Sequence, residues 1–200
     1  MSALSHRQAW DIVADAWRDV HGRSPTYKEA LYTLAIAYLE TGYGRIGQFG
    51  ALADRGQYNW GALERARNAD GSCPPGTAPG TDVGAVCFYV YPSDRAAAAA
   101  FIRTLTTRHW PTIAAMRGSP VDVARAMRVP PPYYAGYAES EEGKVAQYAG
   151  AIAAHAAEIA GQVPSTVPSG SILPSLIVLG GLAAIGYGYV KTYGWPGQRA

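Results

Sequence analysis

One stretch of the chain carries no charge at all: it runs from Ile159 to Val190, between Glu158 and Lys191. All 15 acidic residues precede this stretch. The 17 basic residues, less Lys191 and Arg199, leave 15, so residues 1–160 have no formal net charge. Only 16% of the chain is charged, against about a quarter in ordinary globular domains. A neutral body argues against nucleic acid as a partner, because phosphate-backbone binding needs a basic face.

The uncharged stretch is interpreted as a linker followed by a membrane segment. Residues 161–171 are rich in Pro, Ser and Gly, which predicts a flexible linker. Residues 172–190 are about long enough to cross a hydrocarbon core of about 30 Å as a helix. We therefore expect a transmembrane helix over 172–190, with a lipid bilayer as partner, and a short basic tail over 191–200. A helix buried in a larger assembly is the alternative, although Pro174 and four glycines suit a soluble helix poorly.

Residues 1–160 are expected to form one mainly helical domain. The first helix is predicted over 5–20, with Ser5 as N-cap and Gly22 as stop. The second begins either at Ser24-Pro25 or at a Thr26-x-x-Glu29 capping box, and ends at 41–42. The N-terminal residues form no signal peptide, because charges interrupt them and no apolar core follows.

The second half of this domain alternates one β region with further helices. Residues 59–92 lack helical periodicity and include a β-branched and aromatic run at 86–91, which predicts a small hairpin or short strand pair. Helices are then expected from Ser93 or Asp94 to near Pro111, and over 111–117, 120–128 and 139–160. The predicted class is mainly α (α+β) with a small β-hairpin, plus the C-terminal transmembrane helix.

Two cysteines, Cys73 and Cys87, bracket the loop before the predicted strand. Their spacing fits neither a zinc site nor a CxxC redox pair. A disulfide that closes the loop is the simplest functional interpretation, and it would place the domain in an oxidising compartment. Two unrelated thiols are the alternative. The four histidines show no ligand spacing, so we expect neither a metal nor another cofactor.

Glu40 is the candidate catalytic residue. It ends an apolar helix directly before Thr41-Gly42-Tyr43-Gly44. A carboxylate there meets the negative end of the helix dipole, and burial against Ile36 and Leu39 acts in the same direction. Both effects disfavour the ionised form, which is the requirement for a general acid. An exposed Glu beside a glycine C-cap is the plainer alternative.

Short motifs follow Glu40 in a fixed order: Thr41-Gly42-Tyr43-Gly44, Asn59-Trp60-Gly61, Tyr91-Pro92-Ser93 and Tyr133-Tyr134. In this order they resemble the lysozyme-like superfamily, in particular the endo-β-N-acetylglucosaminidases of glycoside hydrolase family 73 and related lytic transglycosylases. The resemblance spans about residues 4–160. It implies a lysozyme-like fold, Glu40 as catalytic acid, and sugar contacts from Tyr43, Asn59 and Trp60. It also implies that Tyr133, Tyr134 or Tyr137 supplies an aromatic ring near Glu40.

The residue chemistry agrees with a sugar substrate. The chain has 14 Tyr and 5 Trp against 3 Phe, and rings with a polar edge suit sugar faces. A hydrolase with two carboxylates needs a partner about 5–9.5 Å from the acid. The candidates for that partner are Asp54, Glu64, Asp70 and Asp82, and the sequence does not choose among them. Without one, Glu40 would act twice, as in lytic transglycosylation.

The function predicted from these features is cleavage of peptidoglycan glycan strands by a membrane-anchored enzyme associated with a virion or with lysis. Virion or lysis-complex proteins are possible partners. The head would face the periplasm or cell wall, in a virion or a bacterial envelope. The alternative is a catalytically inactive structural or pore-forming membrane protein that keeps a lysozyme-like, glycan-binding domain. In that case the C-terminal segment would carry the function, and copies of it would pack together through small residues such as Gly180 and Ala184.

Overall fold

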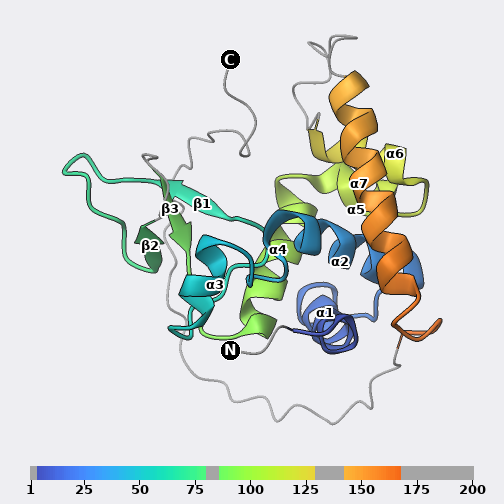
Figure 1. Ribbon diagram of the computed structural model, residues 1–200, viewed down its shortest axis with the longest axis horizontal. Helices are drawn as coiled ribbons and strands as arrows, with labels where there is room; N and C mark the ends of the chain where they lie inside the picture. The colour runs from blue at the N-terminus through green and yellow to red at the C-terminus, as the bar shows by residue number, and fades with distance from the viewer. Residues whose placement is uncertain (1–3, 80–85, 129–141, 168–200) are drawn as a thin grey trace.

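In the computed structural model, residues 4–79, 86–128 and 142–167 are described. Helices at both ends of this part of the chain enclose the core, and a small sheet lies to one side (Figure 1). The helices are α1 (His6–His21), α2 (Tyr27–Thr41), α3 (Gln48–Ala53), α4 (Asp94–Thr107), α5 (Trp110–Ala115), α6 (Pro120–Arg128) and α7 (Glu142–Ala160). The mainly helical class is therefore confirmed.

The first two helices begin and end where local sequence signals place them. Ser5 caps α1 through a capping box with Gln8, and α1 ends at Gly22 in the left-handed conformation. For α2 the capping box of Thr26 and Glu29 forms, so the alternative start at Ser24-Pro25 is wrong. The box prevails because Glu29 also pairs with Arg23 at 2.7 Å, which satisfies a carboxylate that is 1% exposed.

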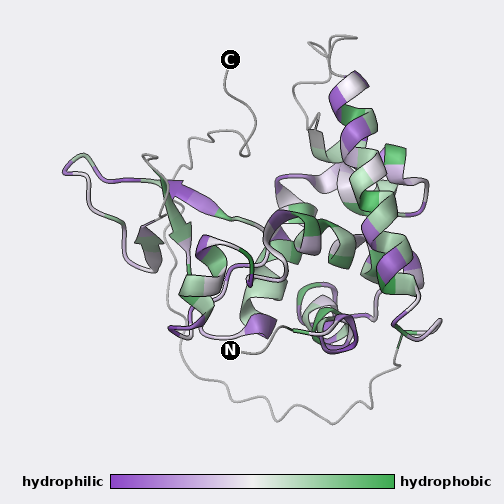
Figure 2. Cartoon of the chain, viewed as in Figure 1, coloured by the Kyte–Doolittle hydropathy of each residue, from purple (hydrophilic) through white to green (hydrophobic). Residues whose placement is uncertain are grey.

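The β region contains three strands rather than the predicted pair. They are β1 (Glu64–Ala66), β2 (Thr77–Pro79) and β3 (Val86–Tyr89), all antiparallel, in the order β1-β3-β2. Phe88 of β3 lies opposite both Glu64 and Ala78. Figure 2 shows a hydrophilic β1 beside a hydrophobic β3, which explains why the sequence indicated only the second. β1 forms because β3 supplies its hydrogen bonds, not because of its own side chains.

The main core lies between α1, α2, α4 and the apolar face of α7. Its largest fully buried side chains include Trp10, Trp17 and Trp60. A second, smaller cluster around Phe49 and Phe88 joins α3 to the sheet, their ring centroids 5.0 Å apart. The sheet is therefore held on the helical body by packing as well as by the chain itself.

No helix among residues 4–79, 86–128 and 142–167 is both long and apolar enough to span a bilayer. The predicted transmembrane helix at 172–190 and the basic tail at 191–200 lie outside the described residues. The same holds for Tyr133, Tyr134 and Tyr137.

Candidate functional site

Glu40 lies in the last turn of α2 and is half-buried. The hydroxyl of Tyr148, on α7, donates a hydrogen bond to Glu40 Oε1 at 2.6 Å. The two residues are 108 positions apart, so only the packing of α7 on α2 brings them together. A carboxyl held at a helix end by a phenol has a fixed direction, as a proton donor or acceptor in catalysis requires.

Tyr148 was not among the residues predicted from the sequence. The resemblance assigned the aromatic partner of Glu40 to Tyr133, Tyr134 or Tyr137, which the structure does not describe. The helical spacing of apolar residues in α7 could nevertheless have indicated Tyr148. Tyr148 falls three residues after Val145 and four before Ile152, both buried, so it lies on the inward face of α7. A tyrosine at such a position usually directs its hydroxyl to a polar partner.

The turn after Glu40 is fixed on the segment that precedes the sheet. The Thr41 hydroxyl donates to the carbonyl oxygen of Trp60 at 2.9 Å and accepts the Gly44 N–H at 2.9 Å. Gly44 has φ +73°, and a Cβ there would lie 3.0 Å from the Asn59 carbonyl oxygen. Glycine adopts this backbone conformation without strain and leaves room for this close approach. The residue after Glu40 is thereby tied to residues 59 and 60.

Asn59 fixes the start of the sheet. Its amide nitrogen donates to the carbonyl oxygens of Leu63 and Tyr89, both at 2.9 Å. Its side-chain oxygen accepts the N–H groups of Gly61 at 3.2 Å and Leu63 at 3.0 Å. All the hydrogen-bonding capacity of this amide is used within the chain.

Tyr43, Asn59 and Trp60 were predicted to contact sugar, and the structure corrects that prediction. Their exposed fractions are 0%, 1% and 0%. The Tyr43 hydroxyl is hydrogen-bonded to His6 at 2.8 Å, and the Trp60 indole N–H donates to Asp94 at 2.9 Å. A side chain without exposed surface cannot stack on a ligand. These residues support the turn after Glu40 from behind instead.

Asp94 connects the same turn to α4. It is the first residue of α4, and its carboxylate accepts from Trp60 Nε1 and pairs with Arg45 at 2.8 Å. The Arg45 guanidinium also lies 4.9 Å from the centroid of the Tyr58 ring. The side chains of Arg45 and Asp94 are 14% and 18% exposed, so this pair is shielded from solvent.

Of the four candidates for a second carboxylate, Glu64 has the most distinctive surroundings. Asp54 and Asp70 are exposed, and Asp82 lies outside the described residues. Glu64 opens β1 and is half-buried, and burial raises its pKa, opposed by the nearby charge of Arg108. Leu63, the residue before it, is bonded to Asn59, and Thr41, the residue after Glu40, is bonded to Trp60, so both carboxyl residues flank one hydrogen-bonded segment. Figure 1 shows the sheet to one side of the α2 and α4 region and α5–α7 to the other.

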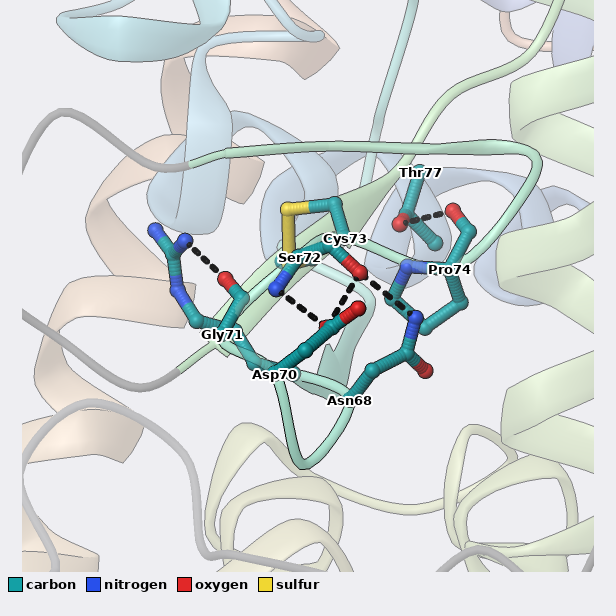
Figure 3. The surroundings of a disulfide bond; sticks show 9 residues. Asn68, Asp70, Gly71, Ser72, Cys73, Pro74 and Thr77 are labelled. Atoms are coloured by element: carbon teal, nitrogen blue, oxygen red, sulfur yellow. Dashed lines mark hydrogen bonds between the residues drawn. A yellow bond between two sulfur atoms is a disulfide. The ribbon is translucent and has the colours of Figure 1, made fainter.

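The predicted disulfide is confirmed. Cys73, before β2, is bonded to Cys87 of β3, with Cα atoms 5.7 Å apart. Figure 3 shows the turn beside it, in which Asp70 accepts the backbone N–H of Ser72 at 2.9 Å and its hydroxyl at 2.6 Å. The bond therefore fastens an otherwise exposed loop to the central strand of the sheet.

Comparisons of the chain with protein-family models, curated proteins and solved structures found no match. Within residues 4–79, 86–128 and 142–167, no group of three or more His, Cys, Asp or Glu side chains is placed to hold a metal ion.

Proposed function

We propose that this protein cleaves the glycan strands of peptidoglycan, with Glu40 as general acid. The observation that carries the proposal is the 2.6 Å hydrogen bond between Tyr148 and Glu40. A half-buried carboxyl at the end of an apolar helix, oriented by a phenol from a distant helix, is an arrangement suited to proton transfer. In the proposed reaction Glu40 donates its proton to the glycosidic oxygen as the bond to C1 breaks.

The second half of the reaction depends on whether another carboxylate takes part. We propose Glu64 for that role, because it is half-buried and opens β1, whereas Asp54 and Asp70 are exposed. It would take a proton from water as the water oxygen attacks C1, which leaves a reducing sugar. If Glu64 takes no part, Glu40 would accept the proton of the muramic acid 6-hydroxyl, which gives a 1,6-anhydro product.

We further propose that residues 172–190 anchor this domain to a bilayer, so that the head reaches cell-wall glycan close to the membrane. This proposal derives from the uncharged sequence alone. It is consistent with a protein of a virion or of a lysis system that opens the wall locally. Flotation of the full chain with liposomes, compared with a chain that ends at residue 167, tests the anchor.

The alternative, a structural or pore-forming membrane protein with an inactive domain, is favoured by one observation. Tyr43, Asn59 and Trp60 are all buried, so the three predicted sugar contacts offer no surface to a ligand. Binding to insoluble peptidoglycan without release of soluble fragments, together with ordered oligomers in membranes, would support this alternative.

The decisive experiment compares the full chain with Glu40→Gln in peptidoglycan zymography. We expect a loss of about 10²–10⁴-fold, because general acid catalysis contributes on that order. Tyr148→Phe keeps the ring and removes the hydroxyl, so a smaller loss is expected. Glu142→Gln on α7 is the matched control, because Glu142 is exposed and its carboxylate pairs with Arg125 on α6. Equal clearing by the wild type and Glu40→Gln would refute the assignment of Glu40.

Mass spectrometry of the digested muropeptides then identifies the reaction. Anhydro ends indicate transglycosylation, and free reducing ends indicate hydrolysis and name the bond cleaved. Glu64→Gln should abolish hydrolysis if Glu64 is the base. Unchanged hydrolysis in that variant would remove Glu64 from the mechanism and leave the role of Glu40 intact.

A further inference from the structure

Two residues other than glycine have a positive φ in the part of the chain that the structure describes. They are Tyr43, with φ +57°, and Ala62, with φ +49°. This conformation is uncommon for a residue with a side chain, and it persists only where the surroundings impose it. Tyr43 follows Glu40 by three positions, and Ala62 precedes Glu64 by two. The two strained positions therefore lie beside the two carboxyl residues proposed for the reaction.

The side-chain amide of Asn59 holds Ala62 from one side. Its Oδ1 accepts the backbone N–H groups of the two neighbours of Ala62, that of Gly61 at 3.2 Å and that of Leu63 at 3.0 Å. Its Nδ2 donates to the carbonyl oxygen of Leu63 at 2.9 Å, so both backbone groups of Leu63 bind the same amide. Backbone N–H groups that converge in this way are typical of a segment that contains a left-handed residue.

The methyl group of Ala62 is held from the other side by the smaller core cluster. Ala62 is 6% exposed and packs in that cluster with Phe49, Leu52, Ala78 and Phe88. Glycine would adopt the left-handed conformation without strain, but it has no methyl group to fill this place. The packing and the Asn59 amide together compensate for the strain at this alanine.

The turn at Ala62 determines where β1 begins and which face its side chains occupy. Tyr89 of β3 donates its N–H to the Leu63 carbonyl oxygen at 2.9 Å, and Glu64 is paired with Phe88. Residues paired in an antiparallel sheet lie on the same face, so Glu64 shares the face by which Phe88 joins the smaller cluster. A slip of one residue would move Glu64 to the opposite face.

We propose that Asn59 is a positioning residue: it holds Ala62 in the left-handed conformation, fixes the register of β1, and so keeps Glu64 where it acts as the base. With Glu64 in place the reaction is hydrolysis. The water oxygen bonds to C1 and gives its proton to Glu64, while the glycosidic oxygen leaves with the proton of Glu40. With Glu64 displaced, the muramic acid 6-hydroxyl attacks C1 and its proton returns to Glu40. The choice of hydrolysis rests on the proposed function, whereas the effect of Asn59 on β1 does not.

The size of the effect follows from the backbone preference that the amide overcomes. An alanine is disfavoured in the left-handed conformation by about five- to thirty-fold relative to the right-handed one. Glycine populates the two about equally. Without the Asn59 amide, an alanine at position 62 should therefore leave this conformation more often than a glycine would.

Rescue of one substitution by another tests the proposal in the full chain. Asn59→Ala removes the amide, so the β1 amides should exchange hydrogen about five- to thirty-fold faster relative to those of α4. Adding Ala62→Gly should restore part of the lost protection, because glycine needs no support at this φ. Ala78→Gly is the matched control, because it removes a methyl group from the same cluster at a position in strand β2. It should restore none.

The proposal is overturned if Ala62→Gly restores no more protection than Ala78→Gly does. If Asn59→Ala alone does not fold, circular dichroism of the two double variants applies the same criterion. Recovery of the folded domain by Ala62→Gly and not by Ala78→Gly supports the role of Asn59, and equal behaviour of the two refutes it.

The ends of the released muropeptides test the catalytic consequence. The wild type should give mainly reducing ends, Asn59→Ala should lower the ratio of reducing to anhydro ends, and Ala62→Gly should raise it again. Asn68→Ala removes an exposed amide that is bonded to Ser72 at 2.9 Å, and it should leave the ratio unchanged. Mainly anhydro ends from the wild type, or the same ratio in Asn59→Ala, would refute this consequence. If the wild type does not clear peptidoglycan, the proposed function fails, and the exchange experiment still decides the role of Asn59.

Discussion

Replacing Asp94 should destabilise this protein more than replacing an exposed carboxylate, because two side chains depend on Asp94 as their partner. It accepts the indole N–H of Trp60 at 2.9 Å and pairs with Arg45 at 2.8 Å. Trp60 is completely buried, so an indole N–H without an acceptor would have no water to replace the lost bond. Leaving such a donor unsatisfied costs about 1–3 kcal/mol, and a hydrogen bond to a charged group contributes about 1.5–3 kcal/mol.

We therefore expect Asp94→Ala to lower the free energy of unfolding by about 3–4 kcal/mol, allowing for partial relaxation. Asp94→Asn retains an acceptor for Trp60 and loses only the charge opposite Arg45, so about 1–2 kcal/mol is expected. The matched control is Asp19→Ala. Asp19 pairs with Arg95 at a similar 2.7 Å, but both side chains are largely exposed, so at most about 1 kcal/mol should be lost.

Denaturant unfolding of the full-length variants, followed by tryptophan fluorescence and circular dichroism, measures these differences. A double-mutant cycle with Arg45→Ala isolates the ion pair from the indole hydrogen bond. If Asp94→Ala costs no more than Asp19→Ala, the claim that this network supports the turn after Glu40 is wrong.

Three further predictions concern stability. Cys73→Ser removes the disulfide and should lower the free energy of unfolding by about 3 kcal/mol, measured by denaturant unfolding. Under reducing conditions this difference between the variant and the wild type should disappear. Burial lowers the pKa of His109 to about 4, so the unfolded chain takes up a proton before the folded one does as the pH falls. About 3 kcal/mol of the free energy of unfolding should therefore be lost between about pH 6.5 and 4. A His109→Gln variant whose stability depends on pH in the same way would contradict this. Gly61→Ala should lower the free energy of unfolding by about 1–3 kcal/mol, because the new Cβ would clash with the Phe101 ring. Gly150→Ala on α7 meets open space and should raise it by about 0.5–1 kcal/mol, measured by thermal unfolding.

The signals that predicted this structure correctly are local ones. Ser5 and Gly22 bound α1 because a cap needs only the backbone groups of the next turn, and such chemistry is readable from a few residues. The strand at 86–89 was found through its own β-branched and aromatic side chains. β1 was missed because Glu64-Arg65-Ala66 has no strand preference and pairs only because β3 is adjacent.

The candidate site likewise combines features that local sequence predicts with features that depend on distant contacts. Glu40 could be selected from its place at the end of a helix, which is local. The roles of Tyr43, Asn59 and Trp60 could not, because polar rings and amides suit a sugar groove and a hydrogen-bonded core equally well. Their burial results from the close approach of the turn after Glu40 to residues 59 and 60, which involves Gly44 and the backbone of Asn59. Burial of this kind depends on contacts between separate segments.

The sequence by itself determined the bounds of α1, the end of α2, the neutral body, the uncharged run after Glu158 and the candidacy of Glu40, because each can be read without knowing the tertiary contacts. Only the tertiary structure decided that Tyr148 holds Glu40, that Glu64 opens a strand connected to the same turn, and that His6 meets Glu158. The members of these pairs are separated by 108, 24 and 152 positions. Contacts across such separations form only when helices pack, and packing is set by the shape and burial of the whole core.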